Sequence, residues 1–380
     1  MEIQRLNATH YDELLSLLGY VFGKKNGREM DFEKEMPKMC IRDDEHMGRH
    51  IGIFDGDRLV ACMGIYPFEV IVAGEKLLFA TTGNIAVHPD HEGQGCMGKM
   101  MDAAMAELDR LDVDAARLGG LRSRYNRYGF EACGSNYGFT FTEKNRQRKF
   151  PDYKGGIRFI KIERDNTSAL EFTVSLYNQN AIIVPRTAEN AYSCLTMWQN
   201  IPYVAYSGDS PIGYLCANPT GNALAEIDAV DTGALADMIC AWQERLGGNL
   251  SFYRQAHQTE SLRLFTAVCE GSSIYSPSHF KIRNWDKMVD AFMKLKATYC
   301  TLADGELCIG IEGFGSIKIY SQNGIVGCDK TDKTPEIVLN PLDASRYIFG
   351  PHPAVFTADA PVSAQAWFPL PLSWNGQDRL

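Results

Sequence analysis

A glycine-rich loop between an apolar strand end and a helix is the part of this sequence most able to do chemistry. The strand ends at Ile85-Ala86-Val87, and the loop carries Gly93-Gln94-Gly95-Cys96-Met97-Gly98 before a helix predicted over residues 98–111. The start of a helix has unpaired backbone N–H groups and partial positive charge, so it binds phosphate groups well. Lys99, on the predicted first turn, adds a positive charge. The loop is therefore predicted to hold a phosphorylated ligand.

Two other phosphate motifs fit this loop poorly. No Gly-Lys-Ser or Gly-Lys-Thr follows it, which excludes a Walker A motif. The six residues from Gly93 do match G-x-G-x-x-G, but that pattern alone is weak evidence. A dinucleotide-binding loop also usually follows the first strand of its domain, whereas this one lies about 90 residues into the chain.

The segment Val87-x-Pro89-x-x-Glu92-Gly93-x-Gly95, followed by a helix, resembles motif A of the GNAT acetyltransferases. In that family the loop holds the pyrophosphate of acetyl-CoA, and backbone groups of the preceding strand pair with the pantetheine amides. The resemblance therefore implies acetyl-CoA as cosubstrate, with no metal. It assigns cofactor binding to Ile85, Ala86, Val87, Gly93, Gln94, Gly95, Cys96, Met97, Gly98 and Lys99.

The loop departs from the family pattern at two positions. Glu92 replaces a basic or amide residue and brings negative charge toward the phosphate site, which Lys99 would offset. Met97 replaces a small residue.

A second match lies about 30 residues further along, where Tyr125-Asn126-Arg127-Tyr128-Gly129-Phe130 resembles the Y-x-x-x-G-F segment that closes a GNAT domain. In many members of the family this tyrosine protonates the departing thiolate. By resemblance, Tyr125 is the candidate general acid. A phenol with a reference pKa of about 10 is protonated at neutral pH and can donate that proton.

The chain of 380 residues is too long for one such domain. Its length and motif order resemble the Eis-like (enhanced intracellular survival) acetyltransferases. This resemblance implies an α/β (α+β) fold: tandem GNAT-fold mixed sheets flanked by helices, plus a sterol-carrier-protein-like α+β domain. We expect a cofactor-binding domain over 1–145, a degenerate second GNAT-like domain over 146–284 and the third domain over 285–380. The same resemblance implies a homo-oligomer, either a hexamer or a smaller assembly.

The C-terminal tail, residues 367–380, carries two tryptophans, three leucines and rigid prolines. Chain ends are normally polar and frayed, so this composition predicts a segment buried against another part of the protein. In the Eis-like group the terminal carboxylate enters the active site as the general base. By resemblance, the carboxylate of Leu380 has that role here; a tail that merely packs on another domain is the alternative.

Composition limits the partners. Hydrophobic residues make up 45% and charged residues 22% of the chain, which is ordinary for a globular protein. A net charge of −9 argues against a nucleic-acid partner, and no apolar run is long enough for a membrane span. The eleven cysteines show no close C-x-x-C pair, and the N-terminus resembles no signal peptide. We therefore expect reduced thiols and a cytoplasmic location.

Several alternatives stay open. His88 and His91 flank the loop and could serve as bases, although turn residues facing solvent explain them as well. The segment Asp31 to Glu35 is a weak candidate for contact with the amine.

The preferred function is direct transfer, in a ternary complex, of an acetyl group from acetyl-CoA to a primary amine. The acceptor could be a polyamine, an aminoglycoside, a lysine side chain or another metabolite. A non-catalytic CoA-binding regulator and a lipid carrier built on the third domain are the competing functions.

Overall fold

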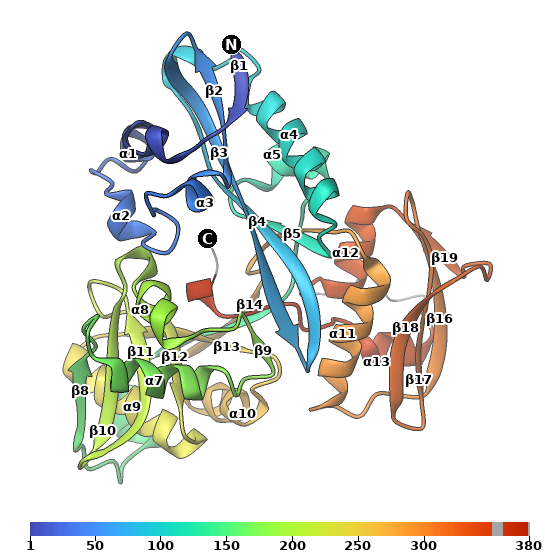
Figure 1. The fold of residues 1–380 in the computed structure, drawn as a ribbon. Coiled ribbons are helices and arrows are strands. Elements are labelled where there is room, and N and C mark those ends of the chain that lie inside the picture. The colour runs from blue at the N-terminus through green and yellow to red at the C-terminus, as the bar shows by residue number, and fades with distance from the viewer. Residues whose placement is uncertain (352–359, 379–380) are drawn as a thin grey trace.

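The computed structural model describes residues 1–351 and 360–378, which form three units of mixed α/β architecture (Figure 1). Several sheets are flanked by helices, which confirms the predicted fold class. Among the described residues, no helix combines the length and the apolar character that a membrane span requires.

The first unit is built on a large sheet with the order β1-β2-β3-β4-β5-β15-β6, and β9 pairs with the end of β3. All neighbours in it are antiparallel except β4 and β5, which are parallel. The long β3–β4 hairpin forms its centre (Figure 1). The strands are β1 (Glu2–Arg5), β2 (His50–Asp55), β3 (Arg58–Val72), β4 (Glu75–Val87), β5 (Ala115–Leu118), β6 (Glu131–Cys133), β9 (Ile182–Ile183) and β15 (Ser278–Ile282).

Helices cover both faces of the upper half of this sheet. Buried side chains alternate along β3, with Val60 and Ile65 packing toward α4 and Cys62 and Tyr66 packing toward α1. The helix α4 buries Met100, Met101, Ala104 and Leu108 on one stripe, which is typical of a helix that packs on a sheet. The helices are α1 (Tyr11–Asn26), α2 (Phe32–Glu35), α3 (Asp44–Met47), α4 (Cys96–Leu111) and α5 (Arg122–Tyr125), with the short 3₁₀ helices η1 (Ala8–His10) and η3 (Asn126–Tyr128).

The second unit contains two sheets, β12-β11-β10-β8 and β13-β7-β14, which an isolated parallel bridge joins between Ala223 and Ser251. Its strands are β7 (Asn136–Phe141), β8 (Ile157–Lys161), β10 (Ile201–Ser207), β11 (Ser210–Ala217), β12 (Leu224–Ala229), β13 (Leu250–Gln255) and β14 (Gly271–Tyr275). Its helices are α6 (Glu143–Lys149), α7 (Thr167–Tyr177), α8 (Ala188–Leu195), η4 (Met197–Gln199), α9 (Thr232–Leu246) and α10 (Thr259–Val268).

The two units repeat one arrangement of elements. In the first, a four-stranded meander (β1 to β4) leads through α4 to β5 and then through α5 to β6. In the second, β8, β10, β11 and β12 lead through α9 to β13 and then through α10 to β14. In each unit the fourth and fifth strands therefore separate along part of their length. One further strand, which we call the added strand, pairs with the fifth strand on its other side.

The added strand is exchanged between the two units. The strand β7, which follows β6 in sequence, pairs with β13 and β14, whereas β15, which follows β14, pairs with β5 and β6. The sheets therefore do not divide at residues 145 and 284, where we expected domain boundaries. Residues 136–141 belong to the second unit's sheet, and residues 278–282 belong to the first. The reason is that strand pairing is decided by partners distant in sequence.

The third unit consists of the helix α11 packed on the sheet β18-β17-β16-β19. Its core is continuous with the lower half of the first sheet, because Phe79 and Phe280 join the cluster that includes Phe292 and Trp367. The elements are α11 (Trp285–Ala297), β16 (Gly305–Ile311), β17 (Gly315–Gln322), β18 (Ile325–Thr331), β19 (Ile337–Leu339), α12 (Pro341–Phe349) and α13 (Val362–Trp367).

The described part of the C-terminal tail is buried, as its composition predicts. The Trp374 ring packs against Phe68, Phe79 and Phe280 of the first sheet, at centroid distances of 6.0, 5.0 and 5.6 Å. The chain then forms the short η6 (Gly376–Asp378), which lies between the first sheet and the second unit (Figure 1).

Candidate active site

The glycine-rich loop joins β4 to α4 and leaves the start of that helix open. Gly93 and Gly95 have left-handed φ values of +76° and +78°, which a side chain would strain. The helix begins at Cys96, two residues before the predicted start at Gly98, so residues 96–98 form its first turn. Gly95 is the N-cap, and no side chain among the described residues caps the helix. The first backbone N–H groups therefore remain available to an anion.

The surface of this loop is unobstructed. No heavy atom of the described chain lies within 4 Å of the Cβ position that a side chain would occupy at Gly93, Gly95 or Gly98. Gln94 and Lys99 are exposed, whereas the Cys96 side chain is buried in the core beside α4. Cys96 therefore contributes backbone rather than its thiol to the loop surface.

Glu92 does not close the helix start. Its residue is exposed and extended, at the end of the 3₁₀ turn η2 (Pro89–His91). Within the described part of the chain, its carboxylate has neither a hydrogen bond nor an ion pair with α4. The charge of Glu92 thus lies near the loop without occupying it.

The strands β4 and β5 separate beside the loop. They pair from Phe79 with Ala115 to Thr82 with Leu118, and the structure describes no strand pairing with residues 83–87 on that side. The divergence coincides with a register shift against β3 and with Asn84, whose φ is +52°. The backbone N–H and C=O groups of Ile85 to Val87 on this edge are consequently free to form hydrogen bonds with the amide groups of a ligand.

A buried polar chain supports the point where β4 diverges. The Asn84 side-chain amide donates to the Tyr66 hydroxyl at 2.7 Å, and that hydroxyl lies 2.7 Å from His50 Nε2. Burial lowers the pKa of His50 to about 4 and raises the pKa of Tyr66 well above its ordinary value. Both side chains are therefore neutral at pH 7, and the phenol can donate to the imidazole.

Tyr125 lies on the β5 side of the same opening. It ends α5 and is buried in the core cluster that includes α4, and its ring comes within 3.0 Å of the position that a Cβ on Gly120 would occupy. Burial raises the pKa of the Tyr125 phenol, against an opposing effect of Arg124. The structure thus places the predicted acid after β5 and the predicted cofactor-binding edge on β4.

A second recess of about 300 Å³ lies between the first and second units. It is lined by residues 38–49, by Tyr66, Pro67 and Phe68 of β3, by residues 184–194 and by Asp378. Its described lining includes the basic side chains of Lys38, Arg49 and Arg186 and the carboxylate of Asp378, which is paired with Arg186. The recess lies on the face of β3 opposite α4, and we name it the acceptor pocket after the role that we propose for it.

Most residues of the acceptor pocket carry no local sequence signal. Arg186 lies in a part of the chain without a recognisable motif, whereas Asp378 belongs to the tail that composition predicts to be buried. The segment proposed for amine contact does not line the pocket: Asp31 caps α2, and Glu35 is buried, accepting from Arg28 at 2.8 Å and from Gln199 at 2.7 Å. Contact of this segment with the amine therefore stays a prediction.

His88, one of the two histidines beside the loop, is held by contacts with Asp90, Arg58 and Tyr20. Nδ1 of His88 accepts from the Asp90 N–H at 3.3 Å, its Nε2 lies 2.9 Å from Arg58, and its ring stacks on Tyr20. His88 is thereby fixed as a turn residue, and the His91 ring packs near it. The predicted base, Leu380, lies outside the described residues.

No group of three or more metal-ligating side chains occurs among the described residues. All eleven cysteines are free thiols, as their spacing predicts.

Comparison with known proteins identifies the first unit. Residues 2–133 match the family model described as acetyltransferase (GNAT) domain, which spans the loop, the divergent strands and Tyr125. The chain therefore contains a GNAT acetyltransferase domain and is an enzyme of the N-acetyltransferase class. No curated protein sequence matches the chain.

Three solved structures share its fold along nearly the whole length. A GCN5-related N-acetyltransferase from Anabaena variabilis has a TM-score of 0.66 at 14% identity, covering 97% of this chain and 97% of that one. A probable N-acyltransferase from Enterococcus faecalis has a TM-score of 0.66 at 15% identity, with 100% and 97% covered. Eis1 from Mycobacterium abscessus has a TM-score of 0.65 at 13% identity, with 99% and 98% covered.

Proposed function

We propose that this protein transfers the acetyl group of acetyl-CoA directly to a primary amine within a ternary complex. The observation that carries the proposal is the uncapped start of α4 beside the unpaired edge of β4. One surface thus offers donors for a diphosphate, and the adjacent strand edge offers partners for the amides of pantetheine.

Cofactor binding is assigned mainly to the backbone. The N–H groups of residues 95–98 hold the diphosphate, and the Lys99 side chain adds a charge at the exposed first turn. Residues 85–87 pair with the pantetheine, which directs the thioester toward the opening between β4 and β5. A backbone N–H near Ile85 or Ala86 then stabilises the developing oxyanion.

Tyr125 acts as the general acid. When the amine attacks the thioester, the C–S bond breaks and the leaving thiolate takes the phenolic proton. Burial keeps the pKa of Tyr125 above its ordinary value of 10.0, so the proton is present at neutral pH before the reaction.

The carboxylate of Leu380 accepts the proton that the ammonium must lose. Support comes from Asp378, which lines the acceptor pocket two residues before the end of the chain. A carboxylate in such a partly dry recess is a stronger base than in water.

The acceptor is a primary amine, namely a polyamine, an aminoglycoside, a lysine side chain or another metabolite. The basic side chains of the acceptor pocket do not select among these by charge, because Arg186 is paired with Glu226 and Asp378, and Arg49 is paired with Glu45 at 2.8 Å. Burial lowers the pKa of Lys38, which favours its neutral form.

Isothermal titration with acetyl-CoA, followed by an assay of free thiol release over a panel of amines, tests the proposal. We expect saturable one-site binding and thiol release that depends on a primary amine. Binding with no amine-dependent release would favour a CoA-binding regulator, and absence of binding would reject the assigned site.

The remaining assignments follow the Eis-like resemblance. We propose that the second unit is a degenerate GNAT domain, that the third is sterol-carrier-protein-like and acts as a scaffold, and that the protein is a cytoplasmic homo-oligomer. Analytical ultracentrifugation tests the last point, which a monomer at micromolar concentration would contradict.

A further inference from the structure

The last described residues of the chain are held by the second unit through a buried ion network. Arg186 donates two hydrogen bonds to Glu226, at 2.7 and 2.8 Å, and two to Asp378, at 3.0 and 2.9 Å. All three side chains are almost fully buried. The Arg186 guanidinium therefore links Glu226 of β12 to Asp378 of the tail, in a part of the protein that is buried from water.

Two tyrosine hydroxyls complete this network. Tyr177 donates to Asp378 at 2.5 Å, and Tyr214 donates to Glu226 at 2.5 Å. The Arg186 guanidinium also lies over the Tyr177 ring, 3.7 Å from its centroid. Buried charges are costly unless they are paired and hydrogen-bonded, so each carboxylate here depends on its partners.

Gln377 is held on several sides. Its side-chain amide donates to the carbonyl oxygens of Cys194 and Leu195, at 3.3 and 2.7 Å, and its side-chain oxygen accepts from Asn200 at 3.1 Å. Its backbone carbonyl accepts from Lys38 of the first unit at 2.9 Å. The tail is thereby fixed between both units at the edge of the acceptor pocket.

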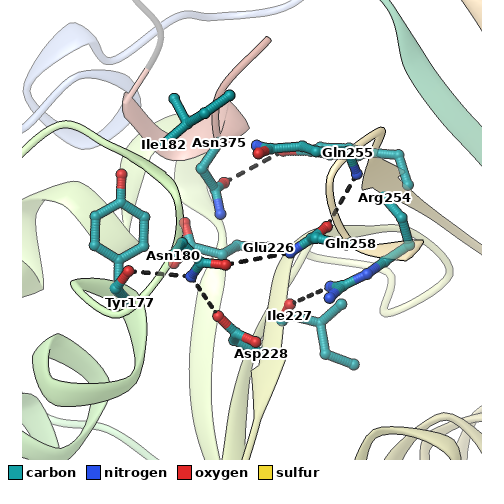
Figure 2. A pocket seen from close by; sticks show the side chains of 11 residues that line it. Tyr177, Asn180, Ile182, Glu226, Ile227, Asp228, Arg254, Gln255, Gln258 and Asn375 are labelled. Atoms are coloured by element: carbon teal, nitrogen blue, oxygen red, sulfur yellow. Dashed lines mark hydrogen bonds between the residues drawn. The ribbon is translucent and has the colours of Figure 1, made fainter. Parts of the chain in front are cut away.

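The tail docks where β12 and β13 diverge, which is the junction that corresponds to β4 and β5. The Tyr253 hydroxyl donates to the Ala225 carbonyl at 2.9 Å and lies 3.2 Å from the Asn375 side-chain oxygen, and the Gly376 N–H donates to the same hydroxyl at 2.5 Å. Figure 2 shows the side chains that fill this junction, including Asn375. They leave a space of about 20 Å³, enough for one water.

We infer that the second unit is the docking site of the C-terminal tail, and that Arg186 and Tyr177 are positioning residues that hold the end of the chain at the acceptor pocket. The docking stands on the contacts described here. Its catalytic purpose rests on the proposed function, in which the terminal carboxylate is the base.

Hydrogen exchange of the full-length protein, measured by mass spectrometry, tests the docking without reference to activity. The N–H groups of Gly376, Gln377 and Asp378 are hydrogen-bonded in the docked tail. In Asp378→Asn, and more so with Gln377→Ala added, exchange of these amides should accelerate at least about tenfold, because bonds to charged groups are lost.

Tyr214→Phe is the matched control, since it removes a buried hydroxyl from the same network without touching the tail. It should leave the exchange of residues 376–378 unchanged, and exchange within α9 should stay constant in all variants if the second unit remains folded. Tail amides that stay protected in the double variant would overturn the inference.

Turnover of the same variants separates the two proposals. If undocking lowers kcat while the affinity for acetyl-CoA is kept, both stand. If undocking leaves kcat unchanged, the docking stands and the terminal carboxylate is not the base.

Discussion

The two repeated units share an order of strands but differ in the segment that follows the fourth strand. In the first, eight residues (88–95) separate β4 from α4, and the helix starts at a bare Gly95. In the second, two residues separate β12 from α9, and the Asp231 carboxylate accepts from the Ala234 N–H at 2.7 Å. The start of α4 is open to an external anion, whereas the start of α9 is already capped by the carboxylate of Asp231.

The strand junctions differ in the same direction. Residues 83–87 of β4 have no described strand partner on the β5 side, whereas two side chains of β13 donate to β12. Tyr253 bonds the Ala225 carbonyl, and Arg254 bonds the Ile227 carbonyl at 2.8 Å. In this arrangement a cofactor site therefore depends on unpaired backbone groups between the fourth and fifth strands. Side chains can occupy those groups, and so remove the site, without changing the order of the strands.

The largest expected effect concerns Tyr125, which has no tyrosine counterpart in residues 256–270 of the second unit. Tyr125→Phe should lower kcat about 100-fold or more, because loss of a general acid costs on this order. The dissociation constant of acetyl-CoA should stay within about twofold. Steady-state kinetics and titration measure both, with Tyr128→Phe as the control in the same segment; a kcat within threefold of wild type would exclude Tyr125 as the acid.

Acid should destabilise both units, the first through the buried His50 and the second through His257, whose ring nitrogens are buried. Burial lowers each pKa to about 4, below the value near 6.5 of the unfolded chain. The unfolded state therefore binds more protons between pH 4 and 6.5, and stability falls as pH decreases through that window, by about 3 kcal/mol per histidine. Urea unfolding at pH 7 and 4.5 measures the loss, which should shrink in His50→Gln; an unchanged pH dependence would contradict the burial argument.

A substitution in the glycine-rich loop before α4 should weaken cofactor binding, whereas the same substitution at the end of α9 should not. Gly95→Val should weaken acetyl-CoA binding roughly 5- to 30-fold, because the left-handed backbone costs a β-branched residue about 1–2 kcal/mol. Gly247→Val is the matched control: it imposes the same strain at φ +69° at the end of α9, again with no described atom near the added Cβ. Calorimetric titration should find its affinity unchanged. Equal losses in both variants would point to general destabilisation.

The smallest expected effect concerns the charge beside the open helix. Glu92→Gln should tighten acetyl-CoA binding about two- to fivefold at low salt, since exposed charges contribute up to about 1 kcal/mol. The gain should fade at high ionic strength, where exposed charges are screened. Titration at two salt concentrations measures it, and weaker binding by the variant would show that Glu92 assists the cofactor.

Local sequence predicts the parts of the fold that depend on neighbouring residues. The turns at Asp55-Gly56-Asp57 and Ala73-Gly74, whose residues suit tight hairpins, join β2 to β3 and β3 to β4. The loop and its helix were also predictable, since glycine permits the left-handed backbone there. The helix start at Cys96 was missed, because a glycine at residue 98 suggested a later boundary.

Contacts between distant segments were not predictable in this way. The exchange of β7 and β15 leaves no local trace, because a strand's sequence does not specify which sheet edge it joins. The pairing of Arg186 with Asp378 likewise joins residues 192 positions apart. For the tail, composition indicated burial but could not indicate where it docks.

The proposed function depends on the open start of α4, whose backbone N–H groups bind the diphosphate of a thioester cofactor. A crystal structure of the protein soaked with coenzyme A tests it most directly. We predict diphosphate oxygens within hydrogen-bonding distance of the backbone N–H groups of residues 95–98, with the pantetheine along residues 85–87. Coenzyme A bound at α9 or elsewhere, with the α4 loop empty, would contradict it.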